Sequence, residues 1–113
     1  MANEPADVAR LRKRIDALDR QIVGLLNERA SLALEIEKTR ASLGQSRTRD
    51  AAREREVLDG VVDANTGPLP DGELLGIYRQ LIAATRRLQA AHRDGILPAS
   101  QRDADSRQDP TRR

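Results

Sequence analysis

One long series of apolar residues, repeated every three or four positions, limits the possible folds more than any other feature. The chain has no proline between residues 8 and 42, and the series consists of Val8, Leu11, Ile15, Leu18, Ile22, Leu25, Leu32 and Ile36. Only a helix brings residues at this spacing onto one face. We therefore predict a helix from roughly Val8 to Ser42, about 50 Å long at about 1.5 Å per residue.

A helix of this length is too long for one small domain to cover. A compact domain of this chain's 113 residues has a radius of gyration of only about 13 Å. The apolar face of the helix therefore needs a second protein surface, and we expect a dimer.

A second helix is predicted over residues 49–64. The segment 43–48 before it has the composition of a loop, in which Gly44 ends the first helix and Ser46 or Thr48 caps the second.

A third helix is predicted over residues 71–93, with Asp71 as its cap. Residues 65–70 form a turn rich in proline and glycine, and no segment shows the period-two alternation of a strand. The fold class is therefore all-α, with three helices of which the first is long.

The folded domain is expected to span residues 8–94. Residues 1–7 and 95–113 are expected to be disordered, because the tail after Pro98 has no large apolar residue that could offset the entropy of ordering. Residues 1–7 contain no apolar run that could serve as a signal sequence, and no 18-residue apolar stretch follows, so we expect a cytoplasmic protein with no membrane partner. The net charge is only +2 and aromatic residues are almost absent, which argues against nucleic-acid binding.

Charged and polar residues interrupt the apolar faces of all three helices. They are Arg29 and Arg40 on the first helix, with Arg12 at its edge, Asp50, Arg53 and Glu54 on the second, and Thr85 and Gln89 on the third. Each charge alone is explained by a side chain that reaches water. A buried charge is costly unless paired, however, so charges on several faces call for a shared explanation. Arginines outnumber carboxylates in this set, which predicts a pocket for a ligand with two negative charges.

Covalent and metal chemistry find little support in the sequence. Cysteine is absent, and the single histidine, His92, has no serine or aspartate companion at a recognisable spacing. Asp50 and Glu54 lack further ligands that would complete a metal site. We expect no metal and no cofactor, and any reaction should proceed by positioning and electrostatics.

Three stretches of the chain resemble, in order, the motifs of the all-helical chorismate mutases. They are residues 11–19 with 25–29, residues 49–56 and residues 77–89, and the similarity covers roughly residues 8 to 92. The resemblance implies an intertwined homodimer whose two active sites each draw on both chains. It also implies the rearrangement of chorismate to prephenate in phenylalanine and tyrosine biosynthesis, without cofactor or metal.

The resemblance assigns substrate binding to several of the polar residues. Arg12 would reach into the partner chain's site and, with Arg29 and Arg53, hold the two carboxylates of the substrate. Thr85 falls where the family commonly has a serine that contacts a carboxylate. Asp50 would contact the ring hydroxyl.

The resemblance places three residues in catalysis. Glu54 matches a position that contacts the ring hydroxyl, and Gln89 matches the donor to the ether oxygen, where negative charge develops as the C–O bond breaks. Arg40 falls where the family usually has a lysine that contacts the same oxygen. Arginine keeps the charge but is larger and presents a planar fork.

Three alternatives remain open at this stage. An isochorismate pyruvate lyase and a 4-amino-4-deoxychorismate mutase share the scaffold, although the intact pairs Arg49-Asp50 and Arg53-Glu54 favour chorismate. A non-catalytic dimerisation module is the alternative of another class, in which the charges would set the register between helices.

Overall fold

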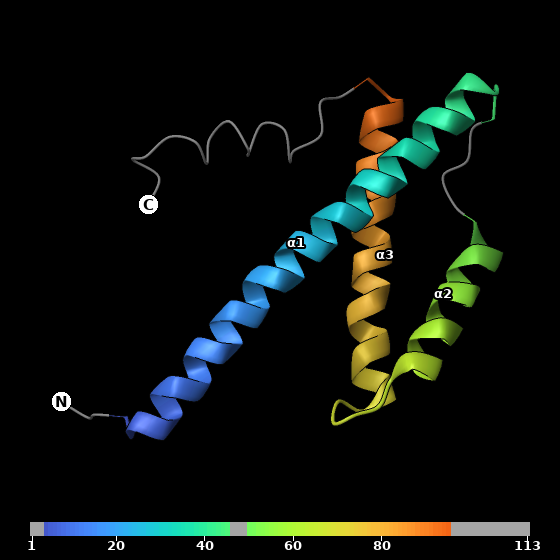
Figure 1. Cartoon of the computed structure of the whole chain (residues 1–113). Coiled ribbons are helices and arrows are strands. Elements are labelled where there is room, and N and C mark those ends of the chain that lie inside the picture. The colour runs from blue at the N-terminus through green and yellow to red at the C-terminus, as the bar shows by residue number, and fades with distance from the viewer. Residues whose placement is uncertain (1–3, 46–49, 96–113) are drawn as a thin grey trace, which may run out of the picture. The chain divides into compact units, whose positions relative to one another are not determined.

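The computed structural model describes residues 4–45 and 50–95. Within these ranges the chain forms three helices, α1 (Ala6–Ser42), α2 (Ala51–Ala64) and α3 (Asp71–Arg93), and no strand (Figure 1). The all-α fold class is confirmed.

α1 begins at Ala6, two residues before the predicted start. The N–H of Ala9 donates to the carbonyl of Pro5 at 3.1 Å, so Pro5 provides the first acceptor of the helix. A proline is well suited to this place because its missing N–H has no helical partner there. The apolar spacing marks the face of the helix but not its first turn, which explains the difference.

α1 ends as the sequence predicts, at the glycine of the following loop. Gly44 adopts a φ of 72°, a conformation that costs glycine little. The N–H of Gln45 then donates to the carbonyl of Arg40 at 2.8 Å, and the N–H of Gly44 to that of Ala41 at 3.1 Å. This pair of bonds is the Schellman motif, which closes the helix after Ser42.

α2 is capped by Asp50, so the prediction of Ser46 or Thr48 as its cap is wrong. Asp50 has extended backbone angles, and its Oδ1 accepts a hydrogen bond from the N–H of Arg53 at 3.0 Å. Aspartate caps as well as serine does, and Asp50 stands directly before the first helical residue. Residues 46–49 lie outside the described part of the chain.

α3 begins at Asp71, but its N-cap is Pro70, which makes no side-chain capping bond. The prediction of Asp71 as the cap is therefore wrong. The Asp71 carboxylate instead accepts from Nδ2 of Asn65 at 2.6 Å, and Asn65 also donates to the carbonyl of Leu69 and accepts from the N–H of Gly67. The Asp71 carboxylate thus connects the end of the turn with Asn65 at its beginning. Residues 96–113, most of the predicted tail, lie outside the described residues.

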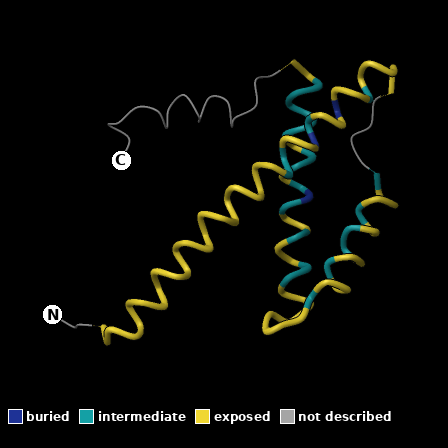
Figure 2. Tube along the Cα trace, viewed as in Figure 1, coloured by how far each residue is buried: buried dark blue, intermediate teal, exposed yellow. Residues whose placement is uncertain are grey.

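The chain divides into two compact units, the first ending at Leu32 and the second beginning at Ala33. The first unit contains most of α1, and its apolar face is uncovered along its whole length (Figure 2). Leu25 is 63% exposed and Ile15 is 55% exposed. A face of this kind needs a covering surface.

The second unit contains the end of α1 together with α2 and α3, which lie side by side (Figure 1). Its core is small. The only buried residues among those described are Ala33, Ile82 and Glu37, while Leu58, Leu74 and Leu75 are half-buried. None of the three helices, as described, is long and apolar enough to span a membrane.

Candidate active site

Six of the eight predicted site residues lie in the second unit, and five of these are half-buried. The five are Arg40 on α1, Asp50 and Glu54 at the start of α2, and Thr85 and Gln89 on α3. All three helices therefore contribute polar side chains to this unit.

Arg40 and Asp50 connect α1 with α2. Nη2 of Arg40 lies 3.9 Å from Oδ2 of Asp50, and both side chains are about 30% exposed. The other carboxylate oxygen of Asp50 caps α2 through the N–H of Arg53. Asp50 thus anchors the first turn of α2 and places a negative charge beside Arg40.

Glu54 and Arg86 connect α2 with α3. Nη1 of Arg86 donates to Oε2 of Glu54 at 2.7 Å, and the two side chains are 34% and 17% exposed. Arg86 is not among the residues predicted from the sequence, because it lies beside the main apolar line of α3. A second line of residues on α3 contains it. Ile82, Arg86 and Gln89 follow one another by four and three residues and so lie on one face of the helix, and Ile82 is the buried residue of α3.

Gln89 connects α3 with α1. Its Nε2 donates to the carbonyl of Ala33 at 2.9 Å, which orients the amide with its nitrogen toward α1. An amide nitrogen carries two hydrogens, so a second donor remains for a ligand. Thr85, one turn earlier, donates its hydroxyl to the carbonyl of Leu81 at 2.8 Å.

The other three predicted site residues make none of the interhelical contacts described above. The side chain of Arg53 is 67% exposed and pairs with Glu56 on its own helix at 3.1 Å. Arg12 and Arg29 belong to the first unit, where Arg12 is exposed and hydrogen-bonds Glu4, and Arg29 is half-buried. The contacts of Arg40 with Asp50, of Glu54 with Arg86 and of Gln89 with Ala33 therefore involve none of these three guanidinium groups.

Glu37 is the most buried side chain of the described residues, and it is not among the residues predicted from the sequence. It is 1% exposed, and neither carboxylate oxygen has a hydrogen-bond partner within the described chain. Nη1 of Arg93 lies 3.8 Å from its Oε1. Glu37 and Arg93 follow Ala33 and Gln89 by one helical turn each, so the ion pair and the amide contact join α1 to α3 at successive turns.

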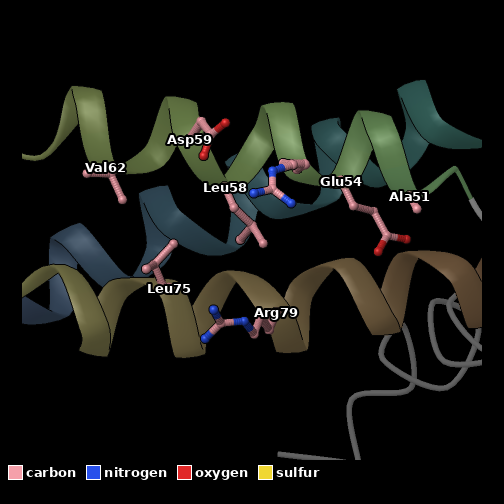
Figure 3. A pocket seen from close by; sticks show the side chains of 8 residues that line it. Ala51, Glu54, Leu58, Asp59, Val62, Leu75 and Arg79 are labelled. Atoms are coloured by element: carbon pink, nitrogen blue, oxygen red, sulfur yellow. The ribbon is translucent and has the colours of Figure 1, made fainter.

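An open groove of about 450 Å³ lies along the α2–α3 contact (Figure 3). Glu54, Leu58 and Val62 point from α2 toward α3, and Leu75 and Arg79 line the opposite side. The groove combines an apolar surface with charged side chains, and Glu54 belongs both to it and to the polar contacts above. Among the residues that the structure describes, no three acidic or histidine side chains gather as a metal site would require.

A sequence profile of type II chorismate mutases matches residues 11–90. The chain belongs to the type II chorismate mutase family. All eight predicted site residues fall inside the matched range, and the resemblance on which they rest is confirmed at the level of the family.

Relatives of known sequence include larger chorismate mutases. The chain is 37% identical over 89 residues to a bifunctional chorismate mutase/prephenate dehydratase of Aquifex aeolicus, which covers 74% of this chain and 24% of that protein. It is 29% identical over 92 residues to a bifunctional protein of the same description from Stutzerimonas stutzeri, covering 77% of this chain and 25% of that protein. The chain thus spans about a quarter of the length of these relatives.

Solved chorismate mutase structures share the fold over nearly their whole length. Form II of chorismate mutase from Thermus thermophilus aligns with a TM-score of 0.70 and 32% identity, covering 74% of this chain and 94% of that one. Form I of the same source aligns with a TM-score of 0.66 and 33% identity, covering 70% and 98%.

Proposed function

We propose that this chain rearranges chorismate to prephenate. One observation carries the proposal beyond family membership. Each pair of helices in the second unit is joined by a polar contact of a predicted site residue, namely Arg40 with Asp50, Glu54 with Arg86, and Gln89 with Ala33. A fold held together only by apolar packing would not need polar groups at these positions.

Charged and amide side chains are the groups that this rearrangement needs. Within one substrate molecule a C–O bond breaks and a C–C bond forms, so no proton, electron or group has to be supplied. The protein needs to hold the compact conformer of the substrate and to stabilise the negative charge that develops on the ether oxygen. Arg40 and the second hydrogen of Gln89 Nε2 would donate to that oxygen.

The remaining residues would hold the substrate. Asp50 and Glu54 would accept from the ring hydroxyl. Thr85 would contact a carboxylate, as would Arg29, Arg53 and Arg12 of a second copy. The exposed side chain of Arg53 would turn from Glu56 toward the ligand in this assignment, which a surface ion pair of small stability permits.

A homodimer is part of the proposal. The uncovered apolar face of α1 supports it, because leaving aliphatic side chains in water forgoes about 25 cal/mol for each Å² of surface. A second copy provides the same face with the same spacing. We also propose a cytoplasmic location, in keeping with a reaction of amino-acid biosynthesis.

The dimer is tested by a charge placed on that face. Leu18→Arg should yield a monomer in sedimentation equilibrium, because the guanidinium would have to be buried without a partner. Ala17→Arg is the matched control, since residue 17 lies on another side of the helix and is exposed. A wild-type chain that sediments as a monomer would contradict the dimer.

The activity is tested by following the loss of chorismate absorbance with the purified protein and identifying the product. Prephenate is the expected product. Release of pyruvate from isochorismate, or turnover of the 4-amino analogue in preference to chorismate, would instead establish one of the other reactions. No turnover of any of these, with a melting temperature that chorismate does not change, would favour the non-catalytic dimerisation module.

A further inference from the structure

The Arg86–Glu54 contact is the shortest ion pair in the described part of the second unit. Nη1 of Arg86 lies 2.7 Å from Oε2 of Glu54, and the two residues are 32 positions apart in the chain. The carboxylate is 17% exposed, so solvent competes little for it. A charge-assisted bond at this distance is among the stronger polar contacts in proteins.

Stability alone gives little reason for this pair. Arg86 is 34% exposed, and ion pairs that reach solvent contribute about 1 kcal/mol or less. α2 and α3 are also held by apolar packing and by their connecting turn, where Asn65 bonds both Leu69 and Asp71. We therefore expect the contact to affect the position of Glu54 more than the stability of the fold.

Glu54 needs such a restraint. A glutamate side chain has three rotatable bonds, and fixing them costs free energy each time a ligand binds. The guanidinium of Arg86 can only donate hydrogen bonds. The Glu54 carboxylate accepts from it, and this contact restricts the rotation of the carboxylate before the ligand arrives. Arg86 directly follows Thr85 and precedes Gln89 by three residues, so one stretch of α3 positions all three groups.

We propose that Arg86 is a positioning residue of the active site, which holds the Glu54 carboxylate in place to accept the hydrogen bond of the substrate's ring hydroxyl. The inference rests on the proposed function. It adds an arginine of α3 to the groups on which turnover depends, through its action on Glu54.

The experiment is a double-mutant cycle on chorismate turnover, with Arg86→Leu, Glu54→Gln and the double variant. Arg86→Leu should lower kcat by about 10- to 100-fold, as the loss of a preorganised geometry does. The double variant should be slower than Glu54→Gln by no more than about twofold, because Arg86 acts only through the carboxylate. Arg86→Lys, which keeps a cationic donor, should recover at least part of the lost rate.

The controls separate positioning from folding and from the function itself. Arg87→Leu removes the neighbouring, exposed arginine and should leave kcat unchanged, and the circular dichroism spectrum of each variant reports the fold. Additive effects of Arg86→Leu and Glu54→Gln, no loss in Arg86→Leu, or no recovery in Arg86→Lys would overturn the inference while leaving the function intact. A wild-type chain that does not turn over chorismate would overturn both.

Discussion

By the resemblance, Arg40 stands where the chorismate mutases usually have a lysine, and the structure shows which group lies beside it. Its Nη2 lies 3.9 Å from Asp50, and the side chain is 27% exposed. A planar fork with five N–H donors has groups to spare after pairing with one carboxylate. Arginine is therefore able to contact both Asp50 and a ligand oxygen.

Arg40→Ala should lower kcat by about 100-fold or more, as the loss of a donor to a developing oxyanion does. The half-exposed end of α1 should keep its structure, so the melting temperature should change little. Steady-state kinetics and thermal unfolding measure the two effects. Arg40→Lys, which keeps the charge, is the matched control and should remain active. Near-normal turnover of Arg40→Ala would rule out its assigned role.

The sequence pattern pointed to polar residues that interrupt the main apolar line of each helix, and it missed two residues of interhelical ion pairs on the neighbouring lines. Glu37 and Arg86 lie on such neighbouring lines, where a charge is ordinarily solvated. Their burial results from the crossing of two helices, which a single-helix pattern does not contain. Arg53 shows the reverse case, because the family motif includes it while its side chain is exposed in the structure.

At the scale of elements, two ion pairs join α1 to the other helices, one to α2 and one to α3. Asp50 caps α2 and pairs with Arg40 in the last turn of α1, so one carboxylate serves both the start of one helix and the contact with another. The Glu37–Arg93 pair joins α1 to α3 in the interior of the second unit. At each contact, a comparison of two variants separates physical effects that a single substitution would combine.

Asp50→Ser should keep the cap and lose the charge, whereas Asp50→Ala should lose both. We expect Asp50→Ala to reduce the free energy of unfolding by about 1 kcal/mol, the usual effect of removing an N-cap, and Asp50→Ser to reduce it by much less. Both should lose activity, because both leave Arg40 without its carboxylate. Urea unfolding and kinetics on the same samples check this, and equal stability of the two variants would contradict the capping role.

Arg93→Met should destabilise the fold by about 3 kcal/mol, because it leaves Glu37 buried without the cation beside it. The double variant Glu37→Met/Arg93→Met should recover most of this loss, since well-packed apolar residues replace buried ion pairs at little cost. Chemical denaturation at constant protein concentration measures both. If the double variant were as unstable as Arg93→Met alone, the pair would not be the cause.

At the scale of the whole molecule, the all-α fold and the three helices followed from apolar spacing alone. The first residues of the helices did not follow from that spacing. A helix cap depends on one side chain reaching one N–H group, and several residues before α2 are suited to that role. The proposed dimer followed from the length of α1 compared with the size of the chain. The uncovered face of the first unit agrees with that reasoning.

Mixing two inactive variants tests whether a site is shared between chains. Arg12→Ala and Arg40→Ala should each be inactive as homodimers. After unfolding and refolding together they should regain roughly a quarter of the wild-type activity, because half of the dimers are mixed and each of these has one intact site of two. Refolding each variant alone is the control. No recovery in the mixture would mean that Arg12 acts within its own chain, and normal activity of Arg12→Ala alone would mean that Arg12 has no part in the site.

The uncovered apolar face of α1 also makes protein concentration a variable of the enzyme. If that face is covered only by a second copy, mass action links folding to association, and the midpoint of thermal unfolding rises as the protein is concentrated. Dilution would then remove structure and turnover together. A cell that makes little of this chain would have less activity per molecule than one that makes much of it.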